Sequence, residues 1–193
     1  MTNFSEALAA LQQPGGLAVI PTDTVYGVVA RAADPAAVER LYKLKKREDK
    51  PGTIVAAGIQ QLEELGLKHR YLTAVEQFWP GAVSVVIPCS DPALKYLHRG
   101  QMSLAVRIPD DPDLLKFLSQ SGPLLTSSAN HPGEPTATTM EQAQAYFGDE
   151  VDAYVNGGDL SNREPSTIIR IVDDAVEVLR QGNVKIEDNG VKK

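Results

Sequence analysis

Two short groups of polar residues carry side chains with which this chain could bind an anionic ligand. The first group, 21–27 (PTDTVYG), holds two threonines, an aspartate and a tyrosine directly after the apolar run 17–20. The second holds Lys45, Arg47 and Lys50 at the end of the next predicted helix. Hydroxyl groups donate and accept hydrogen bonds, and neighbouring cations neutralise a phosphate. Together the two groups indicate a site for a small polar molecule and a phosphate.

Other hydrogen-bonding side chains come at or beside the ends of later predicted strands. Arg107 ends one strand, where a guanidinium can hold a carboxylate or a phosphate through two parallel hydrogen bonds. The others in this position are Thr126, Ser128, Asn130, Ser166 and Arg180. Taken alone, Arg107 also fits a surface salt bridge, and the hydroxyl and amide side chains also fit loop caps. Their common position at strand ends favours one shared cleft.

Predicted strands alternate with predicted helices along most of the chain. The strand at 17–20 is expected to end in an exposed turn at 21–27, because proline and glycine bracket the turn. Asp34 is the predicted N-cap of a helix that runs from Pro35 through Lys46. Further strands are predicted at 53–57, 82–88, 103–108, 124–126, 151–155, 167–172 and 176–179, and further helices at 5–12, 59–67, 113–119 and 138–147. The pattern predicts an α/β fold with an open, mixed sheet whose last two strands form an antiparallel hairpin.

Composition indicates a single globular domain. The chain has 193 residues, of which 42% are hydrophobic and 23% are charged, and we expect one domain over 1–185 and a polar C-terminal tail over 186–193. The net charge of −6 argues against a general nucleic-acid coat protein, which would be basic. No apolar run approaches the roughly 18 residues of a membrane span, and the first residues do not form a signal peptide. A single cysteine, Cys89, fits a reducing compartment, so we expect a cytoplasmic protein without membrane association.

Several familiar catalytic patterns are missing from the sequence. It has no P-loop, no Gly-x-Gly-x-x-Gly after the first strand and no Gly-x-Ser-x-Gly. The three histidines, His69, His98 and His131, show no metal-ligand spacing and are predicted to lie on the surface. Cys89 follows a strand and is predicted to be a small core or rim residue.

Seven motifs together resemble the YrdC/TsaC family of L-threonylcarbamoyladenylate synthases. They occur over nearly the whole chain at 21–27 (PTDTVYG), 45–47 (KKR), 79–81 (WPG), 105–109 (AVRIP), 128–130 (SAN), 166–169 (STII) and 179–182 (LRQG). The resemblance implies a single YrdC-like domain of the short form. It also implies an open, twisted sheet, parallel and antiparallel, with helices around a large concave cavity.

The resemblance further implies an activity. Proteins of this family combine L-threonine, bicarbonate and ATP into threonylcarbamoyl-AMP and pyrophosphate, which makes them nucleotidyltransferases. Mg²⁺ is expected on the ATP phosphates, with no metal ligand from protein side chains. The product would serve N6-threonylcarbamoyladenosine formation in tRNA, with proteins of the TsaD, TsaB and TsaE types acting downstream and contact with tRNA itself left open.

The resemblance also assigns roles to residues by their places in the motifs. Lys45 and Arg47 would be catalytic. L-threonine would be held by Thr24, Arg107 and Ser166. ATP would be held by Lys45, Arg47, Lys50, Thr126, Ser128, Asn130 and Arg180. The chain departs from the usual pattern at Glu48 and Asp49, beside the expected phosphate site, and at Gln181, where relatives carry proline.

Three other functions stay open on the sequence. An RNA-binding module could use the same cleft without ATP chemistry, although the acidic composition and the 6% aromatic content weaken that interpretation. A YciO-like paralogue would have altered Lys-x-Arg and Ser-Ala-Asn motifs, and both are intact here. A carbamoyl-transfer domain of a larger maturation factor would carry zinc-finger or acylphosphatase-like segments, which this sequence does not contain.

Overall fold

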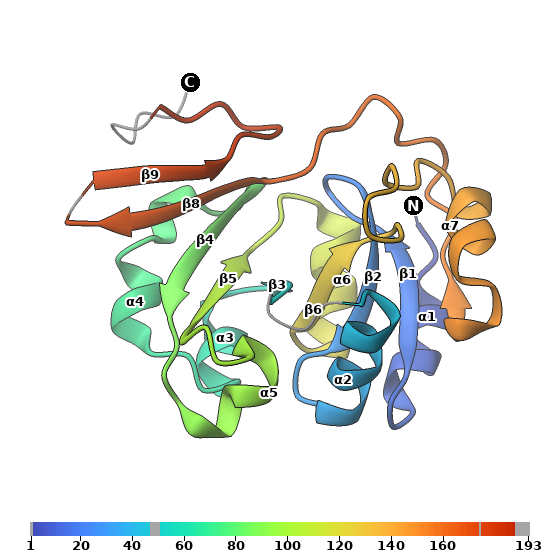
Figure 1. Cartoon of the computed structure of the whole chain (residues 1–193), viewed down its shortest axis with the longest axis horizontal. Coiled ribbons are helices and arrows are strands. Elements are labelled where there is room, and N and C mark those ends of the chain that lie inside the picture. The colour runs from blue at the N-terminus through green and yellow to red at the C-terminus, as the bar shows by residue number, and fades with distance from the viewer. Residues whose placement is uncertain (1, 47–50, 174, 188–193) are drawn as a thin grey trace.

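A single mixed sheet forms the centre of the computed structural model, which describes residues 2–46, 51–173 and 175–187. Its strands follow the order β7-β1-β2-β6-β3-β5-β4-β8-β9 (Figure 1). They are β1 Leu17–Pro21, β2 Tyr26–Arg31, β3 Thr53–Val55, β4 Val83–Pro88, β5 Ser103–Arg107, β6 Leu124–Ser128, β7 Ala153–Tyr154, β8 Thr167–Val172 and β9 Ala175–Arg180. The predicted α/β class with an open sheet is confirmed.

The sheet is mixed because its chain connections are of two kinds. β1 with β7, β3 with β5, and β4 with β8 run parallel, while the other neighbouring strands run antiparallel. Parallel neighbours need a crossover through the helices between them, whereas β8 and β9 need only a tight turn. The predicted antiparallel hairpin at the C-terminal end of the sheet is therefore confirmed.

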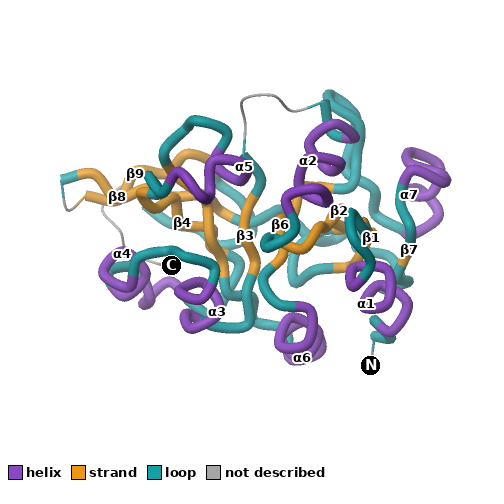
Figure 2. The backbone as a smooth tube through the Cα atoms, turned by 90° about the horizontal axis from the view of Figure 1, so that it is seen from below, coloured by secondary structure: helices purple, strands orange, loops and turns teal. Residues whose placement is uncertain are grey.

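Helices cover the sheet on both faces. They are α1 Ser5–Gln12, α2 Pro35–Leu44, α3 Ile59–Glu64, α4 His69–Thr73, α5 Lys95–His98, α6 Pro112–Ser121 and α7 Met140–Phe147, with short 3₁₀ turns at Glu76–Phe78, Pro92–Leu94 and Gly148–Glu150. At the β1–β2 end, α1 and α6 lie together on one side of the strands and α2 lies on the other (Figure 2). Within the described residues no helix has the length and apolar character that crossing a bilayer would need.

Strand β1 is buried on both faces, which explains its unbroken apolar sequence. Leu17 and Val19 belong to the larger apolar cluster, which includes residues of α2, while Ala18 and Ile20 belong to a second cluster with α1 and α6. Alternate side chains of a strand point to opposite faces, so each face contributes to a different half of the core.

The predicted exposed turn at 21–27 is wrong. Thr22, Thr24 and Tyr26 are buried, with 6%, 3% and 0% of their surface exposed. The reason is β2, a strand that the sequence pattern did not predict, which begins at Tyr26 and pairs with both β1 and β6. Pairing on both edges places Tyr26 inside the sheet, and Thr24 is buried against Arg107, to which it is hydrogen-bonded.

Three other features of the structure differ from the sequence predictions, and the predicted burial of Cys89 is confirmed. His98 was expected on the surface but is 2% exposed, and its Nδ1 accepts a hydrogen bond from the Gly100 N–H at 3.1 Å. Ile186, expected to begin a polar tail, lies in the larger apolar cluster, and positions 188–193 of that tail lie outside the described residues. Helix α2 ends at Leu44 instead of Lys46, where φ is +48°. Cys89 is buried in the core, as predicted.

Asp34 caps α2 as predicted and also ties the helix to the preceding chain. Its Oδ1 accepts hydrogen bonds from the Ala36 and Ala37 N–H groups at 3.0 and 3.1 Å. Its Oδ2 accepts one from the Gly15 N–H at 2.8 Å. The carboxylate thus satisfies two N–H groups that the first turn of a helix leaves unpaired, and it fixes where α2 begins.

Replacement of this cap tests its contribution to stability. We expect Asp34→Ala to lower the free energy of unfolding by about 1–2 kcal/mol, because three backbone donors lose their acceptor. Asp149→Ala, at an exposed aspartate in the turn after α7, is the matched control and should change it by about 0.5 kcal/mol or less. Urea denaturation of both variants makes the comparison, and equal losses would contradict the assigned role of Asp34.

Candidate ligand-binding site

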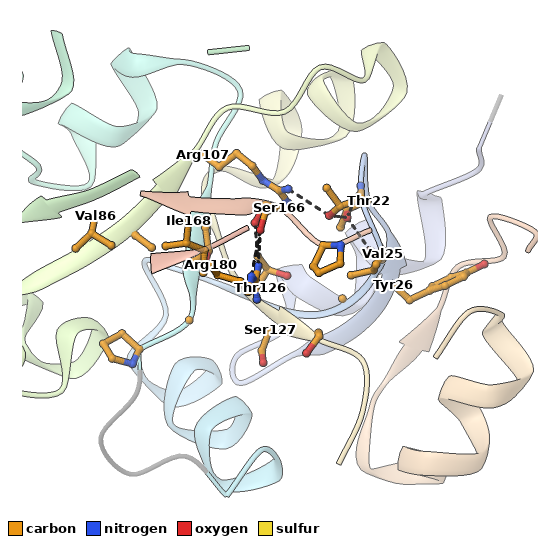
Figure 3. A pocket seen from close by; sticks show the side chains of 18 of the residues that line it. Thr22, Val25, Tyr26, Val86, Arg107, Thr126, Ser127, Ser166, Ile168 and Arg180 are labelled. Atoms are coloured by element: carbon orange, nitrogen blue, oxygen red, sulfur yellow. Dashed lines mark hydrogen bonds between the residues drawn. The ribbon is translucent and has the colours of Figure 1, made fainter. Parts of the chain in front are cut away.

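A cavity of about 390 Å³ lies between the β1–β2 turn, the faces of β3, β5 and β6, and the start of β8 with the end of β9 (Figure 3). Its wall includes eight threonines and serines: Thr22, Thr24, Thr53, Ser103, Thr126, Ser127, Ser128 and Ser166. Tyr26 also lines it, but its hydroxyl donates to the Gly158 carbonyl oxygen at 2.9 Å. Arg107 and Arg180 add two guanidinium groups, and none of the described lining residues is a carboxylate. A wall of hydrogen-bond donors and positive charge fits an anionic ligand.

Arg107 and the two threonines form the first corner of the cavity. Thr22 Oγ1 donates to the Val25 carbonyl oxygen at 2.7 Å, so its own proton is used. The Thr24 hydroxyl, 3.0 Å away, therefore donates to Thr22. Thr24 Oγ1 in turn accepts from Arg107 Nη1 at 3.2 Å. This chain of bonds fixes the guanidinium of Arg107 relative to the turn.

Asp23 compensates the charge of Arg107. The two side chains are 6% and 4% exposed, and Asp23 Oδ1 lies 3.3 Å from Arg107 Nη2. Within the described part of the chain, both Asp23 carboxylate oxygens and Arg107 Nε lack a hydrogen-bond partner. Burial raises the pKa of the Asp23 carboxyl, and the charge of Arg107 opposes that rise. Burial likewise lowers the pKa of Arg107, opposed by Asp23.

Ser166 and Arg180 form the second corner. Arg180 Nε and Nη2 both donate to the Ser166 carbonyl oxygen, at 3.2 and 2.8 Å. Arg180 Nη2 also lies 3.2 Å from Ser166 Oγ. The two residues come from β9 and from the segment before β8, so the terminal hairpin delivers both. Figure 3 shows them facing the same space as Arg107 and Thr126.

Lys45 and Asn130 lie beside the cavity but are not among the residues that line it. Lys45 is 2% exposed, and its ammonium group donates to the carbonyl oxygens of Ser128, at 2.6 Å, and of Asn130. Asn130 Oδ1 accepts from both Lys45 Nζ, at 3.1 Å, and Ser128 Oγ, at 2.7 Å. In this arrangement Lys45 holds the segment that follows β6. The other predicted cations, Arg47 and Lys50, lie outside the described residues, as do Glu48 and Asp49.

The structure thus brings together most of the predicted ligand-binding residues. Thr24, Arg107, Thr126, Ser128, Ser166 and Arg180 all line the cavity. Thr22, the other threonine of the 21–27 group, lines it as well, whereas the sequence interpretation missed Thr53, Gln101 and Ser103. Ser103, Ala105 and Arg107 occupy alternate positions of β5 and share one face. That alternation is the signal that could have found Ser103, because the cavity uses strand faces as well as strand ends.

Three glycines, two of them in the motifs, permit close approaches in this region. A Cβ atom at Gly27 would lie 2.6 Å from Thr126 Oγ1, and one at Gly52 would lie 2.5 Å from the Thr126 carbonyl oxygen. A Cβ at Gly182 would lie 2.1 Å from the Pro165 carbonyl oxygen. Each distance is shorter than two non-bonded atoms allow, so a side chain at any of these positions would displace the cavity wall.

The described residues contain no group of three or more His, Cys, Asp or Glu side chains that could hold a metal ion. The cavity wall offers hydroxyl and carbonyl oxygens in place of carboxylates. The described residues of this wall supply no negatively charged side chain with which to bind a bare divalent cation directly.

The raised pKa of Asp23 predicts a pH dependence of stability. Between the unfolded and the folded pKa, the folded state binds the proton more tightly, so the contribution of Asp23 to the free energy of unfolding falls as pH rises. We expect the difference in this free energy, wild type minus Asp23→Asn, to be larger near pH 4 than near pH 7. Urea denaturation at both pH values measures it. Asp110→Asn, at an exposed neighbouring carboxylate, is the control, and an unchanged Asp23→Asn difference would contradict the prediction.

Comparison with known proteins adds relatives to this geometry. A family profile described as "Telomere recombination" (Sua5, YciO and YrdC) matches residues 10–182. A threonylcarbamoyl-AMP synthase of Bacillus subtilis is 34% identical over 184 residues, which cover 93% of this chain and 53% of the relative. One from Vibrio parahaemolyticus is 35% identical over 188 residues and is covered completely. This chain therefore spans about half the length of the first relative and the whole length of the second.

Solved structures give the same result. P. abyssi Sua5 complexed with L-threonine matches with a TM-score of 0.81 and 30% identity, over 93% of this chain and 54% of that one. E. coli YciO matches with a TM-score of 0.78 over 95% of this chain and 90% of its own, and at 22% identity it supports the fold alone. The matched residues include both corners of the cavity, and the chain belongs to the Sua5/YciO/YrdC family.

Proposed function

We propose that this protein is an L-threonylcarbamoyladenylate synthase, a nucleotidyltransferase that converts L-threonine, bicarbonate and ATP into threonylcarbamoyl-AMP and pyrophosphate. The observation that carries the proposal is the buried Arg107, held between Asp23 and Thr24 at the wall of a hydroxyl-lined cavity. Relatives with this activity in their names and a relative solved with L-threonine support it.

L-threonine would bind at the two corners of the cavity. Its carboxylate would be held by Arg107 and the Ser166 hydroxyl, and Thr24 would keep the guanidinium in place. A buried guanidinium is a strong partner for a carboxylate because little water competes with it. ATP would occupy the rest of the site, held by Thr126, Ser128 and Arg180 on the cavity wall and by Lys45 and Asn130 beside it. The expected roles of Arg47 and Lys50 in holding ATP belong to the same proposal.

The reaction needs no protein nucleophile. The threonine amine forms an N–C bond with the carbon of bicarbonate, whose C–O bond breaks so that water leaves and a carbamate remains. With carbon dioxide the same bond forms as one C=O bond becomes a C–O⁻ single bond and the amine gives up a proton. A carbamate oxygen then bonds to the α-phosphorus of ATP while the bond from that phosphorus to the bridging oxygen of the β-phosphate breaks, and pyrophosphate leaves. Both steps bring negative groups together, so the protein contributes by positioning them and compensating their charge. The arginines and hydroxyls of this cavity suit that task.

Mg²⁺ belongs to this proposal as an ion that arrives with ATP. The cavity wall has no carboxylate among its described residues, which fits an ion held by triphosphate oxygens and water. The ion would neutralise phosphate charge as pyrophosphate leaves. In the wider reaction sequence, the product would be passed to proteins of the TsaD, TsaB and TsaE types for N6-threonylcarbamoyladenosine formation in tRNA.

Pyrophosphate release tests the proposed function directly. Purified protein is incubated with ATP, Mg²⁺ and bicarbonate, with and without L-threonine, and we expect release only when L-threonine and bicarbonate are both present. Pyrophosphate release at the same rate with and without L-threonine would exclude this reaction. A folded protein that binds ATP but releases nothing would favour a YciO-like paralogue with another substrate or an RNA-binding role.

Arg107 gives a residue-level prediction. We expect Arg107→Lys to raise the KM for L-threonine about 10-fold or more, because an ammonium group cannot reproduce the planar, two-pronged contact of a guanidinium. Arg170→Lys is the matched control, since Arg170 is exposed on β8 and pairs with Glu177 at 2.7 Å. Steady-state kinetics with thermal unfolding of each variant makes the measurement. An unchanged KM in a folded Arg107→Lys protein would remove Arg107 from the threonine site.

A further inference from the structure

Ser84 is a buried polar residue in an otherwise apolar strand. It lies in β4 between Val83 and Val85, and all three residues are 0% exposed. In the parallel pairing of β4 with β8, Ser84 lies opposite Ile168, a residue of β8 that lines the cavity. A serine there costs burial of a hydroxyl group, so its hydrogen bond must be accounted for.

The hydroxyl of Ser84 has one hydrogen-bond partner in the described structure, the Ser166 hydroxyl, with 3.0 Å between the two oxygens. The geometry permits either oxygen to donate. If Ser166 donated, the proton of Ser84 would be buried without an acceptor, because water does not reach it. If Ser84 donates, its proton is satisfied. The second arrangement therefore holds.

This direction decides what Ser166 can offer to a ligand. Ser166 Oγ accepts from Ser84 and also lies 3.2 Å from the donor Nη2 of Arg180. With two donors directed at its oxygen, its remaining capacity is its own O–H proton. Ser166 lines the cavity and is 7% exposed, so that proton is available to an acceptor on a ligand in the cavity.

We propose that Ser84 is a positioning residue that keeps the Ser166 hydroxyl as a hydrogen-bond donor toward an anionic group of the ligand. The identity of that group, the carboxylate of L-threonine, rests on the proposed function. Ser84 itself does not line the cavity and acts through Ser166. It belongs to none of the seven sequence motifs.

A double-mutant cycle tests the proposal with the wild type, Ser84→Ala, Ser166→Ala and the double variant. We expect Ser84→Ala to raise the KM for L-threonine about 3- to 10-fold, the equivalent of one neutral hydrogen bond, with kcat and the KM for ATP within about twofold. In the Ser166→Ala background, Ser84→Ala should change nothing further, because the residue through which it acts is gone.

Ser121→Ala is the matched control. Ser121 is also buried, at 6% exposure, and its hydroxyl donates to the Gly122 carbonyl oxygen at 2.9 Å in α6, outside the cavity wall. It should leave all kinetic constants unchanged. Additive effects of Ser84→Ala and Ser166→Ala would overturn the proposal, and so would a lower Tm for Ser84→Ala with an unchanged KM for L-threonine.

A second measurement decides the proposal even where the proposed function fails. If the wild type neither binds L-threonine in calorimetry nor releases pyrophosphate, the proposed function is excluded. NMR of the wild type without ligand then identifies which hydroxyl proton is protected from exchange. A protected Ser84 hydroxyl proton that loses its protection in Ser166→Ala supports the proposal, and a protected Ser166 proton with an unprotected Ser84 proton overturns it.

Discussion

The guanidinium of Arg107 is almost completely removed from water, and the arrangement of the cavity follows from how its charge is compensated. A buried charge is tolerated when an opposite charge and hydrogen-bond acceptors surround it. Asp23 supplies the charge and Thr24 supplies an acceptor, and both belong to the turn between β1 and β2. That turn must therefore stay closed against the end of β5. Closure brings Thr22 and Thr24 to the cavity wall. Among the described residues, the Asp23 carboxylate oxygens and Arg107 Nε are left without a hydrogen-bond partner.

The sheet supplies the remaining wall by placing distant segments in register. Thr53 of β3 pairs with Ala105 of β5 on one side and with Thr126 of β6 on the other. Because side chains alternate along each strand, residues two apart on these neighbours share a face and together form the floor. The parallel pairing of β4 with β8 then carries Ser166 and Arg180 to the opposite end of the sheet order from β1 and β2.

Three cationic side chains in and beside the cavity, among the described residues, have two different uses. Arg107 and Arg180 line the cavity, whereas the Lys45 ammonium group donates hydrogen bonds to the Ser128 carbonyl oxygen and to Asn130 Oδ1. An ammonium group that ties down a loop controls the position of that loop's hydroxyl and amide groups. Under the proposed function, Lys45 would thus act on the nucleotide partly through Ser128 and Asn130.

The sequence by itself determined the features that depend on neighbours along the chain. The Asp34–Pro35 start of α2, the β8–β9 hairpin and the positions of Thr24, Arg107 and Ser166 near strand ends all follow from local pattern. Thr126 was predicted at a strand end but lies in the middle of β6. Tertiary structure alone decided the burial of Thr22 and Tyr26, the existence of β2, and the pairing of Ser84 with Ser166. Strand register and burial arise from contacts between residues far apart in the chain, and a short window of sequence carries no record of which distant strand will lie beside it. The sequence was therefore enough to predict which residue types could bind the ligand. Their burial, which strengthens their electrostatic interactions, depends on the formation of the sheet.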